Sequence, residues 1–379
     1  MASWDWTTVA VFGSAGVIFA GVQWWRHVAG KRAVKAFTAA AHELGMAFTP
    51  GKPGTMSGTV NDIEIAGTEA PGSGGKDGYR FRTSGLPPIS LGGEGFSASR
   101  DDVKTGDTAF DRVIRVDGDE AVVLAVMDAH AREVVAKHVQ SYGGTLRVEK
   151  GVVTLEYLDL PTRPLRIVTD VHAVREMAET LGTRYQRKGR VRCLAENAMT
   201  DPDPAVRLRN LEVLVGQDIE GNEFAVAALD AAIAHDDPRV RLLGAIGRGE
   251  DEIVRAIALE GSPPPSVRVR ALGHLVAVLE TGEAEALLLE VSRDAEAEVQ
   301  LAVVEALGRV GTTRSVERLH ALSGLLSAVG RAASEAASQI QGRLEGAAPG
   351  QLSIASDEGG AVSLAPTPGA LSHAKKTDA

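Results

Sequence analysis

Aromatic residues are scarce in this sequence and make up 4% of its 379 residues. Most of the apolar content comes from alanine, valine, leucine and glycine. Small side chains let helices pack with their backbones close together, whereas a large aromatic-lined pocket needs side chains that this chain has in low number. The length exceeds that of one small core, so we expect two folded units and additional terminal segments.

Cysteine is nearly absent as well. The single cysteine, Cys193, excludes an internal disulfide and fits a reducing compartment. It is either a core residue or a reactive thiol, and its apolar neighbours Val191 and Leu194 favour the core.

Basic residues are outnumbered, with 40 lysines and arginines against 50 aspartates and glutamates. The formal net charge is −10, and the sequence pI is about 5.5. Proteins that bind nucleic acid usually carry a basic domain. We therefore expect no nucleic-acid partner.

Charge is missing altogether from residues 6–25. As a helix that rises about 1.5 Å per residue, this run would cross the roughly 30 Å of hydrocarbon in a bilayer. All four tryptophans lie at its two ends, where indole rings favour the membrane interfaces: Trp4, Trp6, Trp24 and Trp25. We predict a transmembrane helix, with a buried helix of a soluble domain as the alternative. Gly16 and Ala20 form a small-xxx-small pair that could join two such helices into a homodimer, although glycine is also simply common in membrane helices.

The basic residues near this run follow it, at Arg26, Lys31, Arg32 and Lys35, whereas Asp5 precedes it. A signal peptide has the opposite order, with basic residues ahead of the apolar run. The positive-inside rule places the chain after Arg26 in the cytoplasm. The sequence therefore predicts a single-pass protein of the inner (cytoplasmic) membrane, with the bulk of the chain cytoplasmic.

Residues 31–165 have the periodicities of a small α+β domain. Apolar residues recur at helical spacing over Ala33–Leu44, and Gly45 can end that helix. Residues 166–183 are predicted to form a helix that connects this domain to the rest of the chain. The strand-like segments of the domain are Met46–Thr49, Thr55–Val60, Ile63–Thr68, Tyr79–Thr83, Thr145–Glu149 and Val152–Tyr157.

The most distinctive motif of this domain is Thr105-Gly106-Asp107-Thr108-Ala109-Phe110-Asp111. We expect a strand over Arg112–Val116 after it, and then a helix that begins at Asp119 and Glu120. The acidic residues from Asp101 to Asp111 are either a cation site or carboxylates that cap turns around a buried Phe110. The spacing lacks the alternating ligands and terminal glutamate of a calcium loop, which favours capping. The motif loosely resembles one in uncharacterised membrane-anchored bacterial proteins, and that resemblance implies no activity.

One phrase recurs within residues 184–345. Its copies are Asp203-Pro204-Ala205-Val206-Arg207, Asp237-Pro238-Arg239-Val240-Arg241, Pro265-Ser266-Val267-Arg268 and, in degenerate form, Ala297-Glu298-Val299-Gln300. The valines are about 30 residues apart, which is the period of a helical repeat. Proline suits the first turn of a helix, and an aspartate before it caps the free N–H groups. We predict stacked pairs of helices in which the second helices start near Pro204, Pro238, Pro265, Ala297 and Ala328.

This phrase resembles the repeat of the HEAT family, in the short bacterial form also seen in phycobilin lyases. The match is good over Asp237–Arg241 and over Val299–Gly308, and weaker in the third and last copies. The resemblance implies a right-handed α-solenoid over residues 184–345 whose second helices line the concave side. The predicted fold class is therefore mainly α: a C-terminal α-solenoid, a small N-terminal α+β domain and one transmembrane helix.

Arginines occupy matching positions in the copies: Arg207, Arg209, Arg241, Arg268 and Arg270. They form either a stripe that binds acidic groups of a protein partner or an internal ladder. In the ladder, each arginine pairs with Asp203, Asp237 or Asp294 of a neighbouring repeat. The repeats are net acidic, which disfavours a nucleic-acid track in either case.

No catalytic or cofactor-binding constellation is recognisable. The His-Glu dipeptide His42-Glu43 lies outside the repeats, and one such pair cannot build the two-metal site of HEAT-like hydroxylases. No G-x-S-x-G phrase occurs. We expect a protein without enzymatic activity, cofactor or metal, and the alternative is an enzyme with a site near Asp101–Asp111.

Residues 346–379 are rich in glycine, alanine, serine and proline, as is typical of a disordered tail. The motif G-x-[LV]-S-x-A nevertheless occurs there three times, around Leu352 and Ser353, Val362 and Ser363, and Leu371 and Ser372. An extended copy could add as a strand to a partner's sheet, and three copies would raise the avidity. Low-complexity drift and phosphorylated serines are the alternatives.

These features predict a membrane-anchored cytoplasmic adaptor or scaffold. It would bind protein partners through the repeats and the tail, and the membrane through its N-terminal helix. Besides an enzyme, the remaining alternative is a structural component of an envelope complex.

Overall fold

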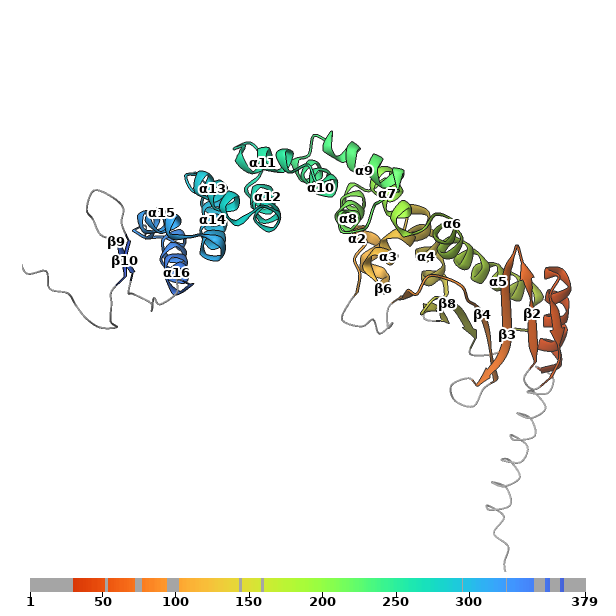
Figure 1. The fold of residues 1–379 in the computed structure, drawn as a ribbon. Coiled ribbons are helices and arrows are strands. Elements are labelled where there is room, and N and C mark those ends of the chain that lie inside the picture. The colour runs from red at the N-terminus through yellow and green to blue at the C-terminus, as the bar shows by residue number, and fades with distance from the viewer. Residues whose placement is uncertain are drawn as a thin grey trace, which may run out of the picture. The chain divides into compact units, whose positions relative to one another are not determined.

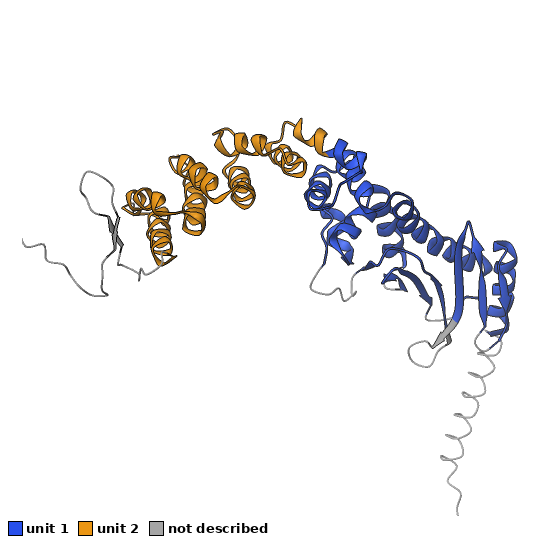
Figure 2. Ribbon diagram, in the orientation of Figure 1, with its two compact units in different colours: residues 1–228 blue, residues 229–379 orange. Residues whose placement is uncertain are grey.

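The computed structural model describes residues 30–51, 54–71, 77–93, 102–142, 145–157, 160–294, 296–324, 326–343, 352–354 and 362–364. Packing divides the chain into two compact units, residues 1–228 and residues 229–379 (Figure 2). The boundary falls inside helix α9 (Glu223–Ile233). Each unit has its own hydrophobic core.

Unit 1 contains an eight-stranded antiparallel sheet with the strand order β1-β2-β3-β4-β8-β7-β5-β6 (Figure 1). Two of its hairpins turn at Asn61-Asp62 and Lys150-Gly151, where φ is 48° and 64°, and 48° and 77°. Such two-residue turns match the twist of the paired strands. The strands are β1 (Ala47–Thr49), β2 (Thr55–Val60), β3 (Ile63–Pro71), β4 (Asp77–Thr83), β5 (Ser90–Gly92), β6 (Arg115–Asp117), β7 (Leu146–Glu149) and β8 (Val152–Tyr157).

The helices of unit 1 begin with residues 30–44. They continue with α2 (Thr108–Val113), α3 (Glu120–Val126), α4 (Ala129–Tyr142), α5 (Pro164–Ala178), the π-helical turn η2 (Glu179–Thr183), α6 (Arg184–Lys188), α7 (Arg190–Thr200) and α8 (Pro204–Val215). The predicted strand over Arg112–Val116 is wrong in its first half. Asp107 caps α2, so Arg112 and Val113 end a helix and the strand β6 begins only at Arg115.

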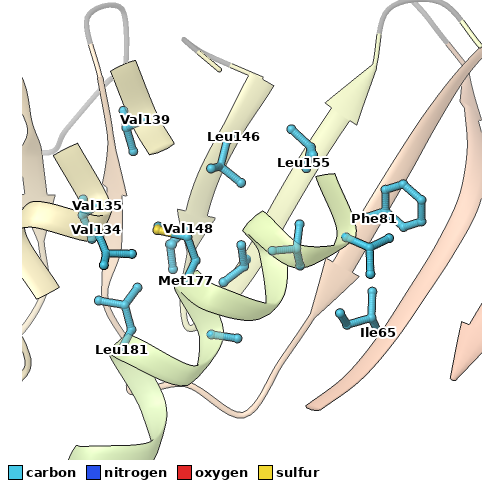
Figure 3. Close-up of a cluster of buried hydrophobic side chains, with 14 of the residues drawn as sticks. Ile65, Phe81, Val134, Val135, Val139, Leu146, Val148, Leu155, Met177 and Leu181 are labelled. Atoms are coloured by element: carbon cyan, nitrogen blue, oxygen red, sulfur yellow. The ribbon is translucent and has the colours of Figure 1, made fainter. Parts of the chain in front are cut away.

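The core of unit 1 lies between the sheet and helices α4 and α5. Figure 3 shows Phe81, Leu146 and Leu155 of the strands on the same side as Val135 of α4 and Met177 of α5. All five side chains are buried. The opposite faces of these strands carry polar side chains such as the ion-paired Arg80 and Glu156, as expected for an antiparallel sheet with one wet face.

Unit 2 consists of paired helices. They are α10 (Pro238–Arg248), α11 (Asp251–Leu259), α12 (Pro265–Val278), α13 (Thr281–Val291), α14 (Ala297–Val310), α15 (Thr313–Ser323) and α16 (Ala328–Arg343). The predicted starts of the second helices at Pro204, Pro238, Pro265, Ala297 and Ala328 are all confirmed.

The helices of unit 2 lie in two rows (Figure 1). Helix α12 packs against α10 and α14, and α14 packs against α16, so these four form the second-helix row. Helices α11, α13 and α15 form the first-helix row, each packed against the second helix that follows it. Two short strands of the tail, β9 (Leu352–Ile354) and β10 (Val362–Leu364), pair antiparallel.

Several predictions of the sequence concern residues outside this description. The predicted span, residues 6–25, lies outside the described residues together with Trp4, Trp6, Trp24 and Trp25, and so does the Gly16 and Ala20 pair. Of the helices that are described, none combines the length and the apolar character needed to cross a membrane.

Candidate functional site

The aspartates of the 105–111 motif hold a turn together. The carboxylate of Asp107 accepts hydrogen bonds from the N–H groups of Ala109 and Phe110, each at 3.0 Å. The carboxylate of Asp111 accepts from the N–H groups of Thr105 (3.0 Å) and Gly106 (3.1 Å), and from the Thr105 hydroxyl at 2.9 Å. Phe110 is buried. The capping interpretation of these residues is therefore confirmed.

Asp102 binds groups at the edge of the sheet and is not part of this turn. Its carboxylate accepts the N–H of Val116 in β6 at 3.1 Å, and it pairs with Lys104 at 2.6 Å. The N–H of Val103 donates to the Val116 carbonyl at 2.8 Å. Residues 102 and 103 thus satisfy backbone groups of an edge strand. Asp101 lies outside the described residues.

One buried arginine connects the turn to the first repeat. Arg132 of α4 is only 5% exposed, and its guanidinium lies 3.0 Å from Asp107 and 2.9 Å and 3.0 Å from the two carboxylate oxygens of Asp201. It also donates to the carbonyl of Met127 at 2.9 Å. Asp201 in turn accepts the N–H of Asp203, the N-cap of α8, at 3.0 Å. We call Asp107, Arg132 and Asp201 the arginine cluster.

The electrostatics of the cluster favour its charged form. Burial alone would raise the pKa of Asp107, but hydrogen bonds from the Phe110 N–H and from Arg132 outweigh burial and hold the pKa below its ordinary value. Burial likewise opposes the charge on Arg132, and the Asp201 and Asp107 carboxylates outweigh it and raise the pKa of Arg132. Two carboxylates around one bidentate guanidinium fix the relative position of three segments.

Apolar and backbone contacts extend this junction. Gly106 has φ of +97°, and a Cβ on it would lie 3.0 Å from the backbone of Ala205, at the start of α8. Helix α3 has all its residues from Ala121 to Val126 buried, and it packs against α7 and α8. The amide of Asn197 donates to the Leu124 carbonyl at 2.8 Å. The 105–111 motif and the first repeat phrase therefore lie in direct contact, which the sequence did not reveal.

Arg132 was not among the residues predicted from the sequence. It lies in the sequence Ala131-Arg132-Glu133, which resembles the exposed face of any helix. Its helix buries Val135 and Val139 on nearly the same side as Arg132, and that position relative to the apolar face was the one available signal.

The predicted arginine row makes mostly internal contacts. Arg268, 2% exposed, donates to the Ala258 carbonyl at 3.2 Å and pairs with Asp294 in the loop before the next second helix. Arg241 lies 3.9 Å from Glu260 in the corresponding loop. The ladder contact predicted with Asp294 is thus present.

The remaining arginines of the row differ from one another. Arg207 donates to the Asp201 carbonyl at 2.7 Å. Arg209 pairs with Glu212 at 3.1 Å and with Glu120 of α3. Arg270 is exposed at its position on α12 and takes part in a polar interaction. The row is therefore not one uniform stripe.

Two other buried residues of unit 1, Asp170 and His138, also have polar partners. Asp170 accepts the hydroxyls of Tyr142, at 2.7 Å, and of Tyr157. Burial and the Asp170 carboxylate raise the pKa of both tyrosines. His138 lies 2.7 Å from Glu176.

In unit 2 the carboxylate of Glu285 sits at the start of α15. It accepts the Thr312 N–H at 2.7 Å, the Thr312 hydroxyl at 2.9 Å and the Ser315 hydroxyl at 2.5 Å. Burial would raise the pKa of Glu285, but these hydrogen bonds outweigh burial and lower it. The carboxylate therefore stays ionised and joins α13 to α15.

Two open cavities lie at the ends of the second helices. One, of about 480 Å³, is lined by Asp237, Pro238, Arg239, Pro264 and Ser266, at the starts of α10 and α12. The other, of about 380 Å³, is lined by residues that include Arg309, Thr312 and Arg343. Arg343 donates to the carbonyls of Gly308 and, at 2.7 Å, Gly311, which end α14.

The tail motif is described in two of its three copies. Ser353 pairs with Ser363 and Leu352 with Leu364, so the two copies are extended and hydrogen-bonded to each other. Leu371 and Ser372 lie outside the described residues.

No protein-family model matches the chain, and no curated protein matches it. The resemblance to the HEAT repeat therefore stays a prediction. Within the described part of the chain, no group of three or more His, Cys, Asp or Glu residues could hold a metal ion.

Proposed function

We propose that this protein is a membrane-anchored cytoplasmic scaffold that binds protein partners on its second-helix row. Residues 6–25 would form the anchor, residues 184–345 a HEAT-like array, and the tail motif an additional tether. The chain would then hold a partner near the inner membrane without acting on it chemically.

The observation that carries this proposal is the packing of unit 2. Helices α10, α12, α14 and α16 follow one another side by side, and each buries one face. Their outer faces carry exposed polar residues, which include Arg239, Ser266, Glu305, Arg331 and Glu335. Stacked repeats of this kind present an extended surface to a partner without forming a deep pocket.

The contacts of the arginines refine which residues would bind. Arg268 is buried in an ion pair, so it is assigned to the ladder and removed from the binding surface. Arg207 and Arg241 are also partly used within the array. A partner would instead meet the exposed positions between these arginines.

Charge reversal on matched glutamates tests the proposal. Glu305 of α14 and Glu335 of α16 are exposed on the second-helix row, and Glu290 of α13 and Glu317 of α15 are exposed on the first-helix row. We expect E305R/E335R in the full chain to lose at least about 90% of the co-purified partner, since reversed charges in an interface cost several kcal/mol. The measurement is quantitative mass spectrometry after affinity purification from detergent-solubilised membranes.

The control is E290R/E317R, which makes the same change in charge on the other row and should keep the partner. Equal retention by both variants, or loss in the control alone, would contradict the proposal. Circular dichroism verifies that both variants are folded.

A further inference from the structure

A concentrated group of basic residues lies where α6 meets α7. Five of them occur within residues 184–192: Arg184, Arg187, Lys188, Arg190 and Arg192. We call this segment the basic elbow. Gly189, with φ of 76° and ψ of 167°, ends α6 and begins α7. In a chain with a formal net charge of −10, the elbow is a local region of opposite sign.

The inner half of the basic elbow is neutralised within the unit. The carboxylate of Glu196 lies 2.7 Å from Lys188 and 3.1 Å from both Arg184 and Arg192. Arg184 also pairs with Asp128 at 3.0 Å. Burial would raise the pKa of Glu196, but the three cations outweigh it and lower that pKa. The inner half of the elbow thus binds one carboxylate, that of Glu196, through three basic side chains.

The outer half has no such counter-charge. Arg187 donates only a long hydrogen bond, 3.4 Å, to the Thr183 carbonyl in its own helix. Arg190 begins α7, and no carboxylate of the described residues forms an ion pair with Arg187 or Arg190. Both side chains are exposed, as is Lys188.

We propose that the outer half of the basic elbow binds an acidic segment of a protein partner. The charge complementarity is direct, because the unpaired guanidinium groups of Arg187 and Arg190 take carboxylates in bidentate geometry. The elbow belongs to unit 1, whereas the second-helix row belongs to unit 2. The proposal rests on the protein-binding role proposed above and supplies the chemistry of one contact.

A neighbouring aromatic ring favours a peptide over a continuous polyanion. The guanidinium of Arg192 lies 3.7 Å from the centroid of the Phe224 ring, and Phe224 is 37% exposed. An apolar side chain of an acidic segment can pack on such a ring.

Fluorescence anisotropy with the detergent-solubilised full chain tests this assignment. The probe is a labelled peptide of alternating glutamate and leucine, and the comparison ligands are a thymidine oligonucleotide of equal charge and vesicles of anionic phospholipid. We expect the peptide to bind and the affinity to fall about tenfold in R187Q/R190Q, since two charged contacts are lost. The affinity should also fall as the salt concentration rises.

The control R293Q/R314Q removes two exposed arginines of unit 2 that lie outside the second-helix row, and it should leave the affinity for the peptide unchanged. The same affinity in R187Q/R190Q as in the unmodified chain, no binding of the peptide, or tighter binding of the oligonucleotide or vesicles would each overturn the assignment. These outcomes are independent of the E305R/E335R experiment. The proposal for the elbow can therefore be wrong while the scaffold proposal is right.

Discussion

At the scale of single residues, the arginine cluster is the feature with the largest expected effect on stability. Arg132 and Asp201 are both buried and form an ion pair. A buried ion pair contributes little compared with an apolar replacement of all its members, but loss of one partner leaves an uncompensated charge. The cluster therefore makes the fold of unit 1 depend on one side chain.

We expect Arg132→Met to destabilise unit 1 by about 3–5 kcal/mol, because Asp107 and Asp201 lose their counter-charge. Urea unfolding followed by circular dichroism measures the loss, and hydrogen exchange of peptides from α3 and α7 locates it. The matched variant Arg112→Met changes an exposed arginine of α2 and should shift the stability by less than about 0.5 kcal/mol. Equal small effects in the two variants would show that the cluster does not hold the junction.

Gly106 allows a second test of the same junction. Gly106→Ala strains a backbone with φ of +97° and places a Cβ 3.0 Å from the backbone of Ala205. Gly85 has a similar φ of +90° but nothing within 4 Å of such a Cβ, so Gly85→Ala has the strain without the contact. We expect Gly106→Ala to cost about 1–3 kcal/mol more than Gly85→Ala in urea unfolding, from overpacking. A smaller cost for Gly106→Ala would mean that the turn and α8 separate without loss of stability.

The residue scale is also where the sequence was least informative. The carboxylates of the 105–111 motif were correctly interpreted, because Asp and Gly in that order cap turns through local hydrogen bonds. Their contact with Arg132 and Asp201 depends on tertiary packing, which no local pattern encodes. The burial of the repeat valines also depends on tertiary packing. Val206, Val267 and Val299 are buried, whereas Val240 at the matching position is only partly buried.

At the scale of elements, the starts of the second helices could be predicted to the residue. The aspartates before Pro204 and Pro238 accept N–H hydrogen bonds at 2.8 Å, at the N-caps Asp203 and Asp237. The strand expected over Arg112–Val116 was wrong because β-branched and polar residues at its start are held in a helix by the Asp107 cap. The position of a helix can thus be predicted from the sequence where its capping residues and its apolar periodicity agree.

The contact between α13 and α15 gives a pH-dependent prediction. The pKa of Glu285 is below its ordinary value of 4.5, so the ionised carboxylate stabilises unit 2 above that pH, and this contribution is lost as the pH falls through the folded-state pKa. Glu285→Gln should remove this part of the pH dependence and lower the stability near neutral pH by about 1–3 kcal/mol, because buried donors lose a charged acceptor.

Urea unfolding between about pH 6 and pH 3 checks this prediction. Glu283→Gln, on the exposed side of the same helix, is the control and should follow the unmodified chain. If the Glu285→Gln and Glu283→Gln variants have the same pH dependence, then Glu285 does not carry the contribution assigned to it.

At the scale of the whole molecule, the chain combines a mainly helical fold with a smaller antiparallel sheet. The first repeat helices α7 and α8 belong to unit 1, where α3 covers them, while the later pairs form unit 2. Repeat arrays need a terminal element that covers the apolar face of the first repeat. The α+β part of unit 1 provides that cover for α7 and α8, which gives it a role that composition alone did not suggest.

Site-specific photo-crosslinking in cells tests the central claim, protein binding on the second-helix row, most directly. A photoreactive amino acid is placed in the full chain at Glu305 or Glu335 of that row, or at Glu290 or Glu317 of the first-helix row. We predict that the same partner protein is crosslinked from both second-row positions and from neither first-row position. Crosslinks of equal yield from both rows, or none from the second row, would contradict the account.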